Sequence, residues 1–153
     1  MATQAGKVEK APLLPRLAEA AYGCVFRLVS WLGLPPPFIV TLEVKGRRSG
    51  RVRSTVLILA EHDGERFAVS VLGDDSDWVR NVRAAGHEAV IRHGRRQRVR
   101  LEEVPAEERA PVLKAYLKWA LGARRIFGLG PDAPIEEFEQ IAPRHPVFRI
   151  VKV

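Results

Sequence analysis

The chain has 153 residues, of which 46% are hydrophobic, so it is expected to fold as one domain around its own core. This composition excludes a disordered chain, and the single cysteine, Cys24, excludes an internal disulfide. A net charge of +7 predicts an anionic partner: a nucleic acid, a lipid surface, or a ligand with phosphates or carboxylates. The four histidines lack the spacing of zinc ligands, so no metal site is expected.

The N-terminal third contains a polar segment followed by an apolar one. Residues 1–11 are expected to form a flexible tail, and residues 12–153 a single domain. Apolar side chains recur at three- and four-residue steps from Leu13 to Leu32, which predicts an amphipathic helix that Gly33 ends. Its apolar face is expected to cover the rest of the domain. The alternative is a membrane-surface contact, since arginines on this helix could meet lipid headgroups.

The region that follows has the two-residue period of β-strands. Six strands are expected, mostly joined by hairpins, and the last, Val147–Val153, is expected to return from a distance and close the sheet. The segment Thr55–Ala60 is almost continuously apolar, which predicts burial on both faces. This spacing favours a barrel or a sandwich, and a barrel leaves no exposed sheet edge.

Helices are predicted between these strands. Ser76 or Asp77 can cap a short helix that carries Trp78. Glu107 and Glu108 are placed in the first turn of a longer helix, and Leu113, Tyr116, Leu117, Ala120 and Leu121 are expected on one side of that helix. A further short helix is expected to begin near Asp132-Ala133-Pro134.

The segment from Gly46 to Gly50 joins two strands and is strongly basic. No nucleophile elbow, P-loop or dinucleotide fingerprint occurs anywhere in the chain. The glycines allow a tight turn whose backbone amides can bind an anion, and guanidinium groups suit phosphate or carboxylate. A solvated hairpin tip is the alternative. The basic residues in this segment and directly after it are Arg47, Arg48, Arg51 and Arg53.

The order of three segments resembles one known family. The turn Gly46-Arg47-Arg48-Ser49-Gly50 with Arg53 after it, the helix from Trp78 through Asn81 to Ala84, and the ending His145–Ile150 are similar to the deazaflavin-dependent nitroreductases. These proteins are also described as quinone reductases that use coenzyme F-420. The resemblance implies a six-stranded, FMN-binding-like split β-barrel, mainly β, with an N-terminal helix and further helices before the last strand.

The resemblance also implies an activity. It predicts an oxidoreductase that transfers a hydride from reduced coenzyme F-420, whose tail is a phosphodiester with several glutamates, to a quinone, a nitro compound or an activated alkene. The residues expected to bind this cofactor are Arg47, Arg48, Ser49, Gly50, Arg53, Thr55, Val56, Leu57, Val71, Leu72, Gly73, Trp78 and Asn81. Tyr116 is the candidate for the proton donor, with a core tyrosine as the alternative, and Trp119 is a candidate for the acceptor pocket.

Two features depart from this family's usual pattern. Val56 stands where members often have proline, and the loop Leu72–Asp75 is short and acidic, so its charge would repel a polyanion. An FMN- or haem-binding split barrel is therefore one alternative, and a basic nucleic-acid or membrane-surface binding protein is another. Nucleic acid is not expected, because aromatic residues are only 7% of the chain and do not interleave with the basic strands.

The cellular setting is inferred from the same features. A cytoplasmic protein is expected, because the chain has one cysteine, and membrane association through the first helix is the alternative. Barrels of this kind often pair, which implies a homodimer.

Overall fold

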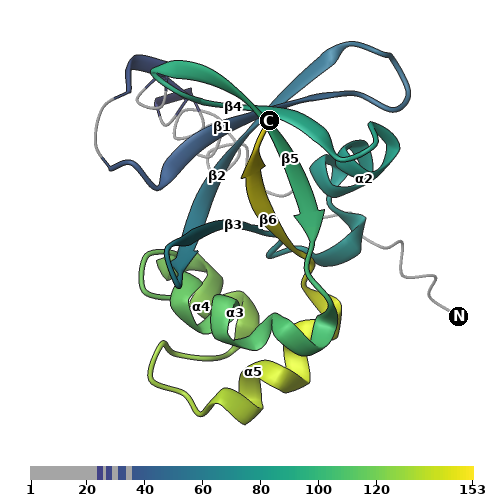
Figure 1. Cartoon of the computed structure of the whole chain (residues 1–153). Coiled ribbons are helices and arrows are strands. Elements are labelled where there is room, and N and C mark those ends of the chain that lie inside the picture. The colour runs from purple at the N-terminus through teal and green to yellow at the C-terminus, as the bar shows by residue number, and fades with distance from the viewer. Residues whose placement is uncertain (1–23, 26, 29–30, 34–35) are drawn as a thin grey trace, which may run out of the picture.

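The computed structural model describes residues 24–25, 27–28, 31–33 and 36–153. Six antiparallel strands close into a barrel in the order β1-β2-β3-β6-β5-β4, as Figure 1 shows. The strands are β1 (Ile39–Lys45), β2 (Val52–His62), β3 (Glu65–Val69), β4 (Glu88–His93), β5 (Arg95–Glu103) and β6 (Val147–Lys152). The expected six-stranded barrel with helices is therefore confirmed.

The N-terminal predictions fall mainly on undescribed residues. The tail at 1–11 lies outside the described residues, and so does most of the amphipathic helix predicted from Leu13 to Leu32. The described residues of that helix, at 24, 25, 27, 28, 31 and 32, are helical. The guanidinium of Arg92 on β4 lies 3.6 Å from the centre of the Trp31 ring, which joins this segment to the barrel.

Hairpins set the register of the first strands. In β1, Val40, Leu42 and Val44 point into the barrel and are buried, as the two-residue period predicts. The β2–β3 connection has positive φ angles of 51° at Asp63 and 74° at Gly64, which is typical of the two-residue turns that match strand twist.

The last strand closes the barrel across a long stretch of chain. Ala68 of β3 pairs with Phe148, and Leu101 of β5 pairs with Ile150, so β6 lies between two strands that are far from it in sequence. This confirms the predicted non-local return of β6. Both edges of the sheet are thereby paired, and no open edge remains to attract another chain.

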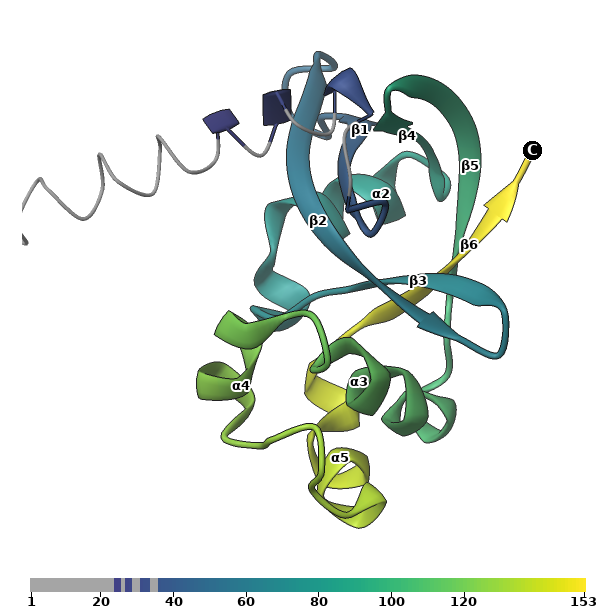
Figure 2. The same ribbon diagram turned by 90° about the vertical axis from the view of Figure 1, so that its left-hand side faces the viewer.

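Two apolar cores lie on either side of the barrel wall. The helix α2 (Asp77–Ala84) contributes Val79 and Val82 to the core inside the barrel. The helices α3 (Ala110–Tyr116), α4 (Leu121–Phe127) and α5 (Ile135–Ile141) gather at the other end, as Figures 1 and 2 show, and pack with β2, β3 and β6. None of the helices in the described ranges has the length and the apolar composition needed to cross a membrane.

The prediction of one long helix that begins at Glu107 is wrong. Glu107 and Glu108 lie in a separate 3-10 turn, and the chain bends after α3, because Ala120 has φ −87° and ψ 73°, outside the helical region. The bend keeps Leu117 and Ala120 buried under the helical layer while Leu121 is left 64% exposed. Packing on the curved barrel therefore overrides the continuous helical period.

The prediction that Thr55–Ala60 is buried on both faces is also wrong. Leu57, Leu59 and Ala60 are buried, whereas Thr55, Val56 and Ile58 are only partly buried. The helical layer packs against the far end of β2 and leaves this apolar stretch beside a cleft. An apolar strand face left partly open is a surface on which a flat ligand can lie.

The packing makes a testable prediction about β6. Phe148 is fully buried inside the barrel and meets the Trp78 ring edge-on, with ring centres 5.5 Å apart. The substitution Phe148→Ala should lower the free energy of unfolding by about 3–5 kcal/mol, because it leaves a cavity at the closure of the barrel. Chemical denaturation measures the change. The control Val153→Ala, at a 79% exposed position, should stay within about 0.5 kcal/mol of the parent. Equal effects of the two changes would contradict this account of barrel closure.

Candidate functional site

A cleft of about 720 Å³ lies between β2, the β1–β2 turn, the start of α2 and the end of α3. It is lined by Val44, Gly46, Arg47, Arg48, Ser49, Arg53, Ser54, Thr55, Val56, Leu57, Ile58, Val69, Val71, Leu72, Ser76, Asp77, Trp78, Asn81 and Tyr116. The structure therefore brings together every residue predicted to bind the cofactor except Gly50 and Gly73. Their roles as cofactor ligands stay predictions.

The two exceptions lie next to the cleft. Gly50 lines a neighbouring cavity on the other side of the turn. Gly73 is buried beneath the Leu72–Asp75 loop with φ +83°, and a Cβ there would lie 2.9 Å from the carbonyl oxygen of Arg144. Glycine is required at this position both by the backbone angle and by the close approach.

The turn that carries the arginines is closed by its own backbone. The Gly46 N–H donates to the Arg51 carbonyl at 2.8 Å, and the Gly50 N–H donates to the Gly46 carbonyl at 2.9 Å. Gly50 has φ +69°, which a residue with a side chain would adopt only with strain. The sequence Gly-x-x-x-Gly therefore gives a compact turn that presents three consecutive side chains at the cleft.

Arg47 ties this turn to α2. Its backbone N–H and its Nη1 both donate to Oδ1 of Asn81, at 3.1 and 2.9 Å, and its Nη2 lies 2.9 Å from Oδ1 of Asp77. Asn81 is buried, so its oxygen needs these donors. The same guanidinium bond holds the pKa of the Asp77 carboxyl below its usual range. Arg47 and Asn81 thus have a clamping role in addition to the ligand role that the sequence predicts.

The remaining groups of the turn suit an anion. Arg48 and Arg53 are exposed at the cleft and have no ion-pair partner among the described residues. The Ser49 Oγ accepts the Arg51 N–H at 3.3 Å, which leaves the hydroxyl proton of Ser49 free for a ligand. Two guanidinium groups and a hydroxyl donor are typical of a phosphate or carboxylate site.

The acidic loop beside the cleft is neutralised within the protein. Asp74 lies 2.8 Å from Nη2 of Arg83, and Asp75 is paired with Arg80. Asp77 is paired with Arg47, so each acid of this loop has an arginine partner. Exposed pairs contribute little stability, but they cancel charge. The repulsion of a polyanion that the sequence alone suggests is therefore weakened.

The far end of the cleft is aromatic and apolar. Tyr116 is 5% exposed, and its hydroxyl has no hydrogen-bond partner within the described part of the chain. Burial raises the pKa of Tyr116 to about 12, so the phenol stays protonated across the ordinary pH range. Trp119, predicted for the acceptor pocket, does not line this cleft and stacks on Phe38 with ring centres 4.8 Å apart.

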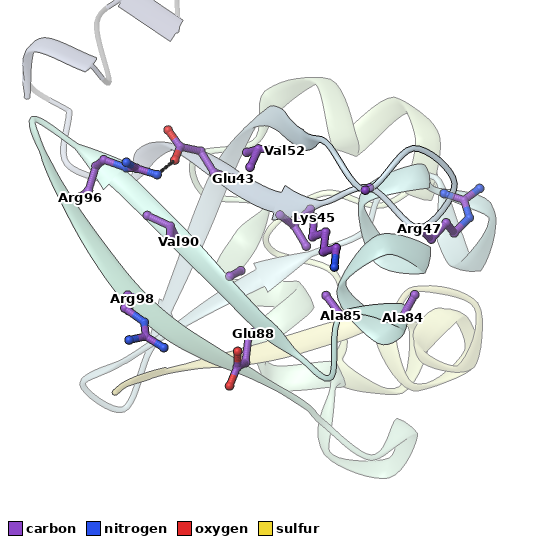
Figure 3. A pocket seen from close by; sticks show the side chains of 14 residues that line it. Glu43, Lys45, Arg47, Val52, Ala84, Ala85, Glu88, Val90, Arg96 and Arg98 are labelled. Carbon is purple, nitrogen blue, oxygen red and sulfur yellow. Dashed lines mark hydrogen bonds and ion pairs between the residues drawn. The ribbon is translucent and has the colours of Figure 1, made fainter.

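A second cavity, of about 680 Å³, lies behind the arginine turn. It follows the outer faces of β1, β4 and β5 and the end of α2, as Figure 3 shows. Arg96 meets Glu43 at one end of it, with 2.7 Å between Nη2 and Oε2, and Arg47 lies at the other end. Lys45 points from β1 toward the α2 end of the cavity. Only the turn and Val44 line both cavities.

Sequence reasoning missed several residues of the cleft. Ser54, Ile58 and Val69 belong to strands whose partners were not known beforehand, so nothing in the sequence placed them at the cleft. Ser76 was predicted only as a helix cap, yet it makes no side-chain cap bond, and its Oγ lies 2.8 Å from Oγ of Ser70. The sequence could not show this role of Ser76, because the loop between the two serines brings Ser70 beside it only in the folded chain.

Comparison with known proteins gives the following. The model of a family described as F-420H(2)-dependent quinone reductase matches residues 27–122. No curated protein matches the chain.

Solved structures with the same barrel have low sequence identity. One described as a domain-swapped dimer has 18% identity and a TM-score of 0.55, and the match covers 91% of this chain and 99% of the other. A conserved hypothetical protein from Mycobacterium tuberculosis has 18% identity, a TM-score of 0.55 and coverage of 82% and 78%. A Clostridium acetobutylicum protein of the pyridoxinephosphate oxidase family has 13% identity, a TM-score of 0.50 and coverage of 75% and 75%. These likenesses establish the fold alone.

The bonds from Arg47 to Asn81, called the clamp below, predict different effects on stability when Arg47 and Arg48 are replaced. The substitution Arg47→Ala should lower the free energy of unfolding by about 1–2 kcal/mol, because the buried Asn81 oxygen loses a charged donor. The matched change Arg48→Ala removes no bond within the described residues and should stay within about 0.5 kcal/mol. Urea denaturation measures both. In an NMR titration, Arg47→Ala should also raise the pKa of Asp77 toward its ordinary value. Equal stabilities of the two variants would contradict the clamp.

Proposed function

Because the chain belongs to the family of F-420H(2)-dependent quinone reductases, whose model matches well over half of it, we propose that it reduces a small apolar acceptor with a hydride from reduced coenzyme F-420. The proposed site is the cleft of about 720 Å³. The proposed acceptor classes are quinones, nitro compounds and activated alkenes.

One observation carries the proposal. The cleft has unpaired arginines at one end, a partly open apolar strand along its wall, and a buried, unpartnered phenol at the other end. A cofactor with an anionic tail and a flat ring needs these features in this order. The residues therefore fit a deazaflavin cofactor, and its ring supplies a hydride when it is bound.

The residues at the two ends have different proposed tasks. Arg48, Arg53 and the free proton of Ser49 bind the phosphate of the tail. Thr55, Val56 and Leu57 form the wall along the ring. Arg47 and Asn81 hold the arginine turn against α2. None of these residues takes part in the hydride transfer.

The acidic loop and the aromatic residues complete the proposed site. The backbone of Val71 and Leu72 is proposed to contact the polar edge of the ring, and Gly73, which is buried and does not line the cleft, contributes through the fold of the loop. Trp78 supports the cleft wall beside these residues, since it packs edge-on against the buried Phe148. Gly50 does not line the cleft but the neighbouring cavity. It contributes through the fold of the turn.

Tyr116 is proposed to position the acceptor and give up a proton to the reduced product. The side chain is largely buried and lines the cleft, and its hydroxyl has no hydrogen-bond partner in the described residues, so it can donate to an acceptor oxygen without breaking an existing bond. The raised pKa, about 12, means that the proton is present at every working pH. Solvent would then return the proton to the phenolate.

A binding titration tests the cofactor. Adding coenzyme F-420 to the purified protein should change the cofactor's fluorescence in a saturable way, and FMN should compete weakly or not at all. The substitution Arg48→Gln should weaken binding about tenfold, because one charged bond to the phosphate is lost. The effect should shrink as salt is raised.

The matched control is Arg95→Gln, at an exposed arginine that begins β5 and lies outside the cleft. It should bind the coenzyme as the parent does. An unchanged affinity of Arg48→Gln would remove the proposed phosphate site. Saturating FMN binding with no F-420 binding would replace the proposed cofactor by FMN.

Replacing Tyr116 tests the acceptor end. The change Tyr116→Phe should lower the turnover number with a quinone acceptor about tenfold or more and leave the F-420 dissociation constant unchanged, since only the hydroxyl is removed. The parent should show no loss of rate from this group between about pH 8 and 10, because its pKa is raised to about 12. Single-turnover kinetics across this range measures both. An unchanged turnover number would assign Tyr116 to packing alone.

A further inference from the structure

Two serines beside the cleft form a directional pair. The Ser70 Oγ donates to the carbonyl oxygen of Gly73 at 2.7 Å, and the Oγ atoms of Ser70 and Ser76 are 2.8 Å apart. A hydroxyl has one proton, and that of Ser70 is already used by a carbonyl, which can only accept. The proton between the two serines must therefore come from Ser76.

This arrangement fixes the polarity of Ser76 at the cleft. Ser76 lines the cleft, and its Oγ makes no other hydrogen bond within the described residues. Its proton points to Ser70, so only its lone pairs remain for a ligand. A phosphate or carbonyl oxygen would be repelled there, and an N–H or O–H group would be accepted.

The pair is held in place by its surroundings. Ser70 is fully buried, its N–H donates to the Pro146 carbonyl at 2.9 Å, and its own carbonyl lies 3.2 Å from Nδ1 of His145. Ser70 is therefore fixed on its backbone and on its side chain. Rotation of Ser76 away from it would leave a buried hydroxyl short of a donor.

The location of Ser76 makes this use unusual. It stands at the N-cap of α2, where a serine oxygen ordinarily accepts a backbone N–H of the first turn. No such bond forms, and the hydroxyl is turned to Ser70 instead. The side chain thus does not serve the helix, and its free lone pairs are left at the cleft.

A second serine of the same cleft has the opposite polarity. Ser49 accepts a backbone N–H and keeps its proton for a ligand, whereas Ser76 gives its proton away and keeps its lone pairs. The cleft therefore has a donor hydroxyl beside the unpaired arginines and an acceptor hydroxyl at the start of α2.

We propose that Ser76, polarised by Ser70, is a specificity residue that accepts a hydrogen bond from the deazaflavin portion of the cofactor. The donor is either the ring imide N–H or a ribityl hydroxyl, since both are neutral donors on that portion. This inference rests on the proposed function. It adds that the cleft recognises a donor on the ring–ribityl portion independently of the phosphate.

The test uses fluorescence titrations with two probes, coenzyme F-420 and its ring–ribityl fragment without the phosphate tail. The substitution Ser76→Ala should weaken both probes by the same factor, about fivefold, because one neutral hydrogen bond is lost. The substitution Arg48→Gln should weaken only the coenzyme. Ser76→Thr, which keeps the hydroxyl, should restore binding of both probes.

A fragment methylated at the imide nitrogen identifies the donor. If the imide N–H is the donor, Ser76→Ala should have no effect on the methylated fragment. If a ribityl hydroxyl is the donor, the fivefold loss should persist with the methylated fragment and vanish with a ring that lacks the ribityl chain. Thermal unfolding of each variant checks that the fold is kept, as expected for a side chain without a cap bond.

A second variant keeps the test decisive if Ser76→Ala folds poorly. Ser70→Ala frees the proton of Ser76 without touching the cleft lining, and it should also weaken the ring–ribityl fragment several-fold. Parental affinity of Ser76→Ala for the fragment would overturn this inference and leave the proposed function intact. A parent protein that binds neither probe would overturn both.

Discussion

The site depends on one buried oxygen. Oδ1 of Asn81 accepts the backbone N–H and the guanidinium of Arg47, and through these bonds the β1–β2 turn is fixed to α2, which packs Val79 and Val82 into the barrel core. A buried amide oxygen without donors would be costly, so the turn can leave α2 only by paying that penalty. The directions in which Arg48, Ser49 and Arg53 face the cleft follow from this attachment. The arginine end of the cleft is therefore ordered before a ligand arrives, which reduces the entropy lost on binding.

The charge distribution around the cleft follows from the same helix. α2 supplies Arg80 and Arg83, which neutralise Asp75 and Asp74, and Arg83 also reaches Glu103 at the end of β5. Arg109 extends this set, with its Nη2 3.6 Å from Glu103 and its Nε bonded to the Val104 carbonyl. The acids beside the cleft are thus each engaged by an arginine, whereas Arg48 and Arg53 have no ion-pair partner among the described residues. Local pairing of these acids reduces the negative potential that an anionic ligand would meet at the cleft.

Much of the fold and of the cleft lining could be predicted from the sequence, because these features depend on residues close together in the chain. The alternation in β1, the glycines of the arginine turn and the order of motifs before Trp78 depend on neighbouring residues, and they placed the fold and most of the cleft correctly. The failures were non-local. The helix after Glu108 breaks because the curved barrel needs Leu117 and Ala120 turned inward, and the outer face of β2 stays partly open because the helical layer covers only one end of it. The period of a segment does not record what packs against it.

The roles of the two adjacent arginines in the turn also depend on contacts that the sequence does not show. Arg47 and Arg48 are adjacent, identical in type and equally suited to a phosphate from the sequence alone. The structure separates them, because Asn81 and Asp77 lie within reach of one guanidinium and not of the other. The serines are separated in the same way. Ser49 and Ser76 have the same side chain, but the partner of each fixes where its single proton goes, so one presents a donor to the cleft and the other an acceptor. A donor hydroxyl and an acceptor hydroxyl can then coexist in one cleft, since the two polarities are set by separate partners, the Arg51 N–H and the Ser70 hydroxyl.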